Sequence, residues 1–128
     1  MSLLAPVSVG EFLDKLTILE IKSEKITDPQ KLDNILQELE AVRTTWLSSA
    51  YADVEMEPEL SQLKAVNERL WAIEDDIRDK ERDQLFDAKF IELARSVYIT
   101  NDQRAALKKA LSLKSGSELV EEKSYAEY

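Results

Sequence analysis

The sequence predicts an all-α protein, a single-domain bundle of four to five helices built on a long antiparallel helical hairpin. Apolar residues recur at helical spacing along most of the chain. Only 2 glycines and 3 prolines occur in 128 residues, too few for the many tight turns of an all-β protein. The length fits one domain, residues 1–128, which can bury a core without disulfides.

A first helix is predicted from Ser8 to about Ile26. Ser8 and Glu11 have capping-box spacing, in which the serine oxygen accepts from the Glu11 N–H. The apolar residues that follow lie on more than one side of the helix. This pattern is typical of a helix that is sandwiched in a core or used in a dimer interface.

The second and third helices are predicted to be long. Asp28 suits the N-cap of a second helix that should end near Ser48, and Pro58 opens a third helix that should end near Glu81 or Arg82. At about 1.5 Å per residue, each spans roughly 30–36 Å. We therefore expect these two helices to pair as the antiparallel hairpin.

The rest of the chain is expected to complete the bundle. A fourth helix should begin near Phe86, and the capping-box spacing of "TNDQ" at Thr100 predicts a break and a fifth helix that ends near Leu111. Gly116 is a helix stop signal. Residues 113–128 are expected to form a C-terminal tail that is either flexible or docked on the body or on a second subunit.

Composition excludes several classes of function. The 26 acidic and 17 basic residues give a net charge of −9, which repels nucleic acid and anionic membranes. The chain has no cysteine and no histidine, so disulfides, thiolate metal sites and histidine-based catalysis are excluded. No apolar run approaches the roughly 18 residues of a membrane span, and "MSLLAPVSV" lacks the basic region of a signal peptide. A cytoplasmic protein is expected.

Asp75, Asp76 and Asp79 read D-D-x-x-D, a spacing with which isoprenoid-diphosphate enzymes hold magnesium against a diphosphate. With Leu70 at zero on a helical wheel, Asp75, Asp79 and Asp76 lie at about 140°, 180° and 240°. The buried stripe lies within about 60° of Leu70. The three aspartates are therefore predicted to face water, and no metal is assigned to them.

The flank of that stripe holds better candidates for a site. Asn67, Trp71, Glu74 and Arg78 lie at about 20–100° on the same wheel. Polar groups there are half-buried if a neighbouring helix leans over them. Two interpretations remain open, namely an interhelical salt-bridge network around Glu74 and a ligand-binding cleft.

Two further groups of polar residues were considered as sites. Glu20 and Glu24 are one helical turn apart and, with Glu74 from a facing helix, would suit a divalent cation, or they pair with surface lysines. Around the expected helix break, an anion would suit the free N–H groups of the next helix together with Arg95 or Arg104. Alternatively, Asn101 and Asp102 merely begin that helix and Tyr98 is core. The full set of ligand-binding candidates is Glu20, Asn67, Trp71, Glu74, Arg78, Arg95, Tyr98, Asn101 and Asp102.

Four stretches carry a resemblance to a known family: "GEFLDKLTILEIKSEKI", "VNERLWAIEDDIRDKE", "FIELARSVYITNDQRAALK" and "GSELVEEKSY". They resemble an uncharacterised, mostly bacterial family of small helical proteins classed as a domain of unknown function. The resemblance carries over no activity and no catalytic residue. It implies an accessory role close to surface-glycan biosynthesis.

These observations favour a non-enzymatic helical binding or accessory protein, either a homodimer or a protein that engages a protein partner. No nucleic acid, membrane or cofactor is expected. The alternative is a small enzyme or ligand-binding protein with an inter-helix cleft for a phosphate or carboxylate, with Mg²⁺ under this alternative alone. The alternative predicts candidate residues that converge on one concave pocket. The interaction protein predicts candidates that are spread out or paired, with exposed apolar surface.

Overall fold

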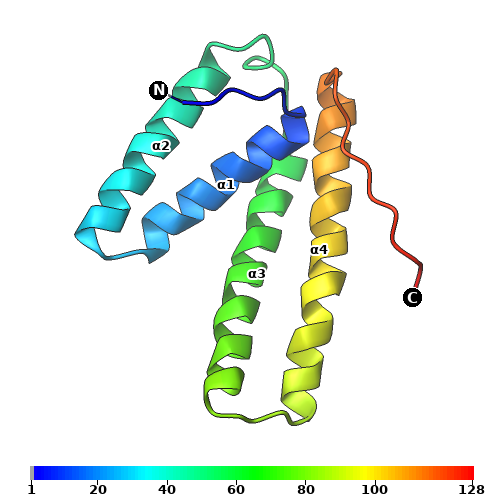
Figure 1. The fold of residues 1–128 in the computed structure, drawn as a ribbon. Helices are drawn as coiled ribbons and strands as arrows, with labels where there is room; N and C mark the ends of the chain where they lie inside the picture. Colours follow the sequence, from blue (N-terminus) through cyan, green and yellow to red (C-terminus); the bar gives the residue numbers. More distant parts are fainter. Residues whose placement is uncertain (1) are drawn as a thin grey trace.

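The computed structural model describes residues 2–128, and within that range it contains four helices and no strand. The helices are α1 (Val9–Lys25), α2 (Pro29–Leu47), α3 (Glu59–Arg82) and α4 (Ala88–Ser115). In Figure 1, α3 and α4 stand side by side and antiparallel, α1 crosses one end of this pair, and α2 lies beside α1. The predicted all-α bundle is confirmed. Within residues 2–128, none of the helices is both long and apolar enough to span a membrane.

Helices α1 and α2 begin where the cap residues Ser8 and Asp28 predict, and α4 ends at the predicted stop signal Gly116. Ser8 Oγ accepts from the Glu11 N–H at 3.1 Å, and Asp28 Oδ2 accepts from the Lys31 N–H at 2.9 Å. Gly116 ends α4 in the left-handed conformation, with φ of 72°. The predicted ends of the second and third helices lie within one residue of the observed ends. Local hydrogen bonding therefore determines most helix boundaries in this chain.

The predicted break at Thr100 is wrong, because α4 is one continuous helix of 28 residues that runs through this position from Ala88 to Ser115. Leu93, Thr100 and Leu111 are all buried, and a wheel places them within about 20° of one another. They form one uninterrupted stripe on α4. Threonine and asparagine cost only a few tenths of a kcal/mol inside a helix, so packing outweighs the cap signal at this point.

The long hairpin is formed by α3 and α4, and the predicted pairing of the second and third helices is wrong. The backbone of α2 lies beside that of α1 and not beside that of α3. The connections explain this difference. Residues 83–87 alone join α3 to α4, whereas residues 48–58 separate α2 from α3. A short connection makes consecutive helices antiparallel neighbours, while a longer one lets them part.

Helix α1 is at the centre of the core and packs against all three other helices. Its Leu13 and Ile21 are 0% and 1% exposed. This central position accounts for the apolar residues on several sides of α1, for which the sequence left open a core or a dimer interface. The main apolar cluster consists of Val9, Leu13, Leu16, Leu19, Leu39, Val42, Met56, Leu63 and Leu111.

The close approach of α1 to α4 depends on Gly10. A Cβ built on this residue would lie 2.0 Å from the backbone oxygen of Lys108, so only glycine lets the two backbones meet. The same crossing satisfies the first N–H groups of α1. Gly10 N–H donates to Ser112 Oγ at 2.9 Å, and Val9 N–H donates to Ser117 Oγ at 3.1 Å.

The C-terminal residues run back along α4 (Figure 1). Lys109 Nζ lies 2.9 Å from a carboxylate oxygen of Glu122. At the far end, the Tyr128 hydroxyl donates to Asp102 at 2.6 Å. These contacts correspond to the docked form of the tail, one of the two forms considered from the sequence.

Candidate functional site

An open cleft of about 430 Å³ lies where α1 turns away from the α3–α4 hairpin. We call it the junction cleft. It is lined by Ile18, Ile21, Asn67, Leu70, Trp71, Glu74, Asp75, Arg78, Asn101 and Arg104. Five of the nine predicted ligand-binding candidates therefore meet here, namely Asn67, Trp71, Glu74, Arg78 and Asn101. The cleft is built from three helices and combines an apolar wall with charged groups.

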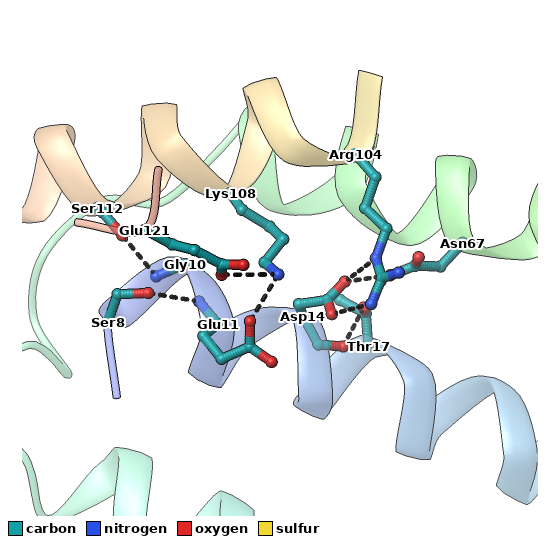
Figure 2. Close-up of polar contacts among 10 residues, drawn as sticks. All are labelled: Ser8, Gly10, Glu11, Asp14, Thr17, Asn67, Arg104, Lys108, Ser112 and Glu121. Carbon is teal, nitrogen blue, oxygen red and sulfur yellow. Dashed lines mark hydrogen bonds and ion pairs between the residues drawn. The ribbon is translucent and has the colours of Figure 1, made fainter. Parts of the chain in front are cut away.

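A buried carboxylate lies beside this cleft. The Asp14 side chain is only 2% exposed and accepts two hydrogen bonds from Arg104, from Nε at 2.9 Å and from Nη2 at 2.5 Å. Asn67 Nδ2 donates to Asp14 at 2.9 Å and to Thr17 Oγ1 at 2.9 Å. Thr17 in turn donates to the Asp14 backbone oxygen at 2.8 Å. Figure 2 shows these four side chains converging from α1, α3 and α4.

Arg104 and Asp14 form an ion pair that is also doubly hydrogen-bonded. The hydrogen bonds from Arg104 to Asp14 raise the pKa of the guanidinium above its ordinary value, although burial alone would lower it. A buried charge is tolerated only when it is paired and hydrogen-bonded. Asp14 meets that condition, and Arg104 is held in one orientation at the edge of the cleft.

The sequence interpretation missed Asp14 and Thr17, although a signal was present. With Leu13 at zero on a wheel of the first helix, Thr17, Ile21 and Asp14 lie at about 40°, 80° and 100°. Two polar residues therefore share an arc with residues that the structure buries. A carboxylate in such an arc needs a cationic partner from another helix. Which helix supplies the partner depends on the crossing of α1 with α4.

Glu74 is paired along its own helix. It forms an ion pair with Arg78, one turn on, and the two side chains are 43% and 69% exposed. The sequence predicted an interhelical partner for Glu74 or a role in a cleft. The structure shows an intrahelical pair on the wall of the junction cleft, so the interhelical network is not formed by Glu74.

Glu20 lies away from the junction cleft. Its carboxylate is 3.7 Å from Lys64 Nζ and 3.7 Å from an Arg43 nitrogen, and Glu24 lies 3.1 Å from the same lysine. These contacts correspond to the surface-pairing interpretation rather than to a cation shared with Glu74. In residues 2–128, no group of three or more acidic residues is arranged to hold a metal ion.

The remaining candidates lie on another side of α4, beside the C-terminal tail. Tyr98 is 44% exposed, so the interpretation of Tyr98 as a core residue is wrong. Its ring packs edge-on against Tyr128 with centroids 5.3 Å apart, and its hydroxyl accepts from Arg95 Nε at 3.4 Å. Asp102 accepts from the Tyr128 hydroxyl. Asn101 lines both this depression under the tail and the junction cleft.

The D-D-x-x-D residues face solvent as the wheel predicts. Asp75, Asp76 and Asp79 are all exposed, and Asp79 pairs with Arg82 at 3.0 Å along the same helix. Asp75 reaches the rim of the junction cleft, whereas Asp76 and Asp79 lie further round the helix. The spacing of the three aspartates therefore does not bring them to one point.

A second polar group ties the tail to α1 (Figure 2). Lys108 Nζ lies 2.6 Å from Glu11 and 3.1 Å from Glu121. Burial lowers the pKa of Lys108, but the hydrogen bonds to Glu11 and Glu121 together with the nearby charges of Asp14 and Glu11 raise it, and the net shift is upward. This group holds α1, α4 and the tail together at the end of the molecule opposite the 83–87 loop.

The comparison with known families gives one result. A family model described as a family of unknown function, DUF6165, matches residues 4–128, and the chain belongs to this family. This confirms the resemblance seen in the sequence. No curated protein and no solved structure matches the chain significantly.

Proposed function

We propose that this member of DUF6165 is a non-enzymatic binding protein that self-associates through the distal half of its α3–α4 hairpin. We call distal the half next to the 83–87 loop, and proximal the half that α1 crosses. The observation that carries the proposal is that α1 covers only the proximal half. At about 1.5 Å per residue, its 17 residues span about 25 Å, against about 36 Å for α3 and about 42 Å for α4.

The uncovered part of the hairpin is apolar. Ile77, Phe90, Ala94 and Val97 are half-buried, and Phe86 is 53% exposed at the end of the pair. Phe86 and Phe90 pack edge-on with ring centroids 5.1 Å apart. We call these five residues the open hairpin face. Apolar side chains grouped in this way are typical of an interaction surface.

The open hairpin face continues the side of the hairpin that α1 covers. With Leu93 at zero, Phe90, Ala94 and Val97 lie at about 40–100° on α4. Asn101 of the junction cleft lies in the same arc and Arg104 lies beside it at about 20°, while Val97 also lines the depression under the tail. A further helical layer is therefore missing along the distal half. The hairpin of a second copy supplies two antiparallel helices, which would complete a four-helix bundle there.

The charges beside this face suit a two-fold partner. Glu74 and Arg78, which form an ion pair, lie along its edge on α3. A surface that carries both signs can pair with a copy of itself related by two-fold symmetry. The net charge of −9 on each copy opposes association at long range, so added salt should strengthen the dimer by screening.

Polar contacts favour a binding protein over an enzyme. The predicted site residues are divided between two sides of α4, and Glu20 and Glu74 are each paired with basic side chains. Throughout residues 2–128, no buried side-chain polar atom lacks a hydrogen-bond partner. A cytoplasmic location without cofactor or nucleic acid belongs to this proposal. The accessory role near surface-glycan biosynthesis stays a prediction of the family resemblance.

Analytical ultracentrifugation tests the proposal. The wild-type chain should sediment as a dimer of about twice 14.7 kDa, and more completely in higher salt. Ala94→Glu places a charge on the open hairpin face and should weaken the dimer by about tenfold or more. Ala106→Glu makes the same change at an exposed position of the same helix and should leave the dimer intact.

Either of two results would overturn the proposal. One is a wild-type chain that stays monomeric at millimolar concentration and high salt. The other is a dimer that Ala94→Glu and Ala106→Glu affect equally, with circular dichroism showing that both variants are folded.

A further inference from the structure

We infer that the junction cleft binds a small carboxylic acid with an apolar body, whose carboxylate pairs with the free edge of the Arg104 guanidinium. This site is separate from the open hairpin face and does not depend on self-association. It takes its ligand from residues of α1, α3 and α4 within one chain.

Arg104 has only one of its edges occupied. A guanidinium carries five N–H donors, and the hydrogen bonds to Asp14 use Nε and Nη2, which share one edge. The other edge carries one N–H on Nη1 and the second N–H on Nη2. Within residues 2–128, Nη1 of Arg104 takes part in no hydrogen bond. Two parallel N–H groups of this kind bind a carboxylate with two hydrogen bonds.

The guanidinium is held in place before any ligand arrives. The buried carboxylate of Asp14 fixes its occupied edge, and Asn67 fixes that carboxylate from α3. The Arg104 side chain is 29% exposed and lines the cleft, so it is anchored yet accessible. Ordering a flexible side chain on binding costs conformational entropy, and this arrangement avoids that cost.

Amide groups beside Arg104 extend the polar part of the cleft. Both hydrogens of Asn67 Nδ2 are taken by Asp14 and Thr17, which leaves Asn67 Oδ1 as an acceptor. This orientation is required, because a carboxylate only accepts hydrogen bonds and the amide nitrogen must face it. Asn101 adds a second amide to the lining. A ligand hydroxyl or N–H next to the carboxylate therefore has acceptors within the cleft.

The opposite part of the lining is apolar and suits a hydrocarbon or aromatic group. Ile18 and Ile21 come from α1, and Leu70 and Trp71 come from α3. The cleft volume of about 430 Å³ lies in the range of about 300–1,000 Å³ common to small-molecule sites. The combination of one anchored arginine and a four-residue apolar wall selects an amphipathic anion.

The surrounding charges favour a carboxylate over a phosphate. Two positive groups, Arg78 and Arg104, stand near three negative ones, Asp14, Glu74 and Asp75. Two positive and three negative charges leave a local balance of −1. A phosphate that carries close to two negative charges is repelled more strongly than a carboxylate that carries one.

Heteronuclear NMR with defined probes tests the inference. The chain has two tryptophans, so the indole N–H of Trp71 reports on the cleft and that of Trp46 is an internal control. Phenylacetate and hexanoate should shift the Trp71 signal saturably, with half-saturation at about 1 mM or below. 2-Phenylethanol, which lacks the charge, and inorganic phosphate, which lacks the apolar body, should bind at least about tenfold more weakly.

Substitutions locate the binding group. Arg104→Lys keeps a positive charge beside Asp14 but removes the free edge, and should weaken phenylacetate binding by about tenfold or more. Asn101→Glu places a negative charge on the cleft wall without touching the Asp14 network and should weaken binding similarly. Arg95→Lys, the same change outside the cleft, should leave binding unchanged.

Three results would contradict the inference. The first is the lack of a saturable Trp71 shift with either acid at about 20 mM, well beyond the affinity expected of such a site. The second is equal binding of phenylacetate and 2-phenylethanol. The third is undiminished binding by Asn101→Glu, a variant that keeps its folded spectrum even if Arg104→Lys loses it. Oligomeric state is read separately by sedimentation, so this site and the proposed dimer succeed or fail independently.

Discussion

The two halves of the α3–α4 hairpin are built from the same two helices, but a third helix packs on only one of them. In the proximal half, α1 lies across the pair, Ile21 is 1% exposed and the buried Asp14 network links three helices. In the distal half only the seam between α3 and α4 is closed, through residues such as Ile73 and Leu93. Two paired helices bury the side chains between them, but the side chains on their outer faces stay accessible unless another element packs there. Stability is therefore concentrated where the third helix lies, and surface for partners is left where it does not.

The largest loss of stability is expected from breaking the proximal ion pair. Arg104→Met leaves the Asp14 carboxylate buried without its cation, which should lower the free energy of unfolding by about 4 kcal/mol. Urea denaturation followed by circular dichroism measures this change. Arg95→Met, at an exposed position of the same helix, should stay within about 0.5 kcal/mol of wild type. Equal losses of unfolding free energy in the two variants would show that the Arg104–Asp14 ion pair does not stabilise the fold.

The same substitution in each half tests the difference in burial directly. Ile21→Ala in the proximal core should cost about 3 kcal/mol, because Ile21 is fully buried and a cavity remains. Ile77→Ala on the open hairpin face should cost about 1 kcal/mol, because its side chain is only half-buried. Urea denaturation at a concentration where the chain is monomeric gives both values. If Ile77→Ala lowered the free energy of unfolding as much as Ile21→Ala, the difference in burial between the two halves would be contradicted.

Gly10→Ala tests how tightly α1 approaches α4. The added Cβ would lie 2.0 Å from the Lys108 backbone oxygen, and the overpacking should cost about 3 kcal/mol. Replacing glycine in a helix returns about 1 kcal/mol, so a net loss of about 2 kcal/mol is expected in thermal or urea unfolding. Gly116→Ala meets no atom within 4 Å but keeps a φ of +72°, and should cost about 1 kcal/mol. If Gly10→Ala left the free energy of unfolding unchanged, α1 and α4 could move apart at no cost in stability.

The smallest effect is expected at the C-terminal tail at high pH. The hydrogen bond from Tyr128 to Asp102 raises the pKa of the phenol above its ordinary value of 10.0. The neutral phenol is the donor, so this contact is present below pH 10.0 and is lost as pH rises through the raised pKa. A spectrophotometric titration of tyrosinate should show one tyrosine that ionises late, and Tyr128→Phe should remove that step. The inference about the tail contact fails if Tyr128→Phe instead removes a tyrosine of ordinary pKa.

Helix boundaries set by cap hydrogen bonds could be predicted from the sequence, whereas the packing partners of the helices could not. Ser8, Asp28 and Gly116 act on N–H and C=O groups within a few residues of themselves, so their effect can be read from the sequence. Thr100 has equally good cap spacing, but its burial keeps the helix intact. The wrong hairpin pairing has another cause, because cap signals indicate where helices begin and end and not which helices pack together.

The candidate site shows the same division. The phase of α3 placed Asn67, Trp71, Glu74 and Arg78 on one flank, and all four line the junction cleft. The prediction for Glu20 combined its spacing from Glu24 with an assumed approach of Glu74, whereas its partners Arg43 and Lys64 lie on α2 and α3 outside the cleft. Arg95, Tyr98 and Asp102 were grouped around a helix break that α4 does not have. The sequence therefore predicts which residues share one face of a helix, but not which helices bring their faces together.

The serine contacts at the start of α1 bear on the order in which the chain can fold during synthesis. Gly10 and Val9 donate to serines that lie 102 and 108 residues further along the chain. A ribosome therefore releases the first helix long before the groups that complete its first turn are made. Contacts so distant in sequence delay folding, and the nascent helix keeps its apolar surface open in the meantime. We expect the native fold to close only after the end of α4 has emerged from the ribosome.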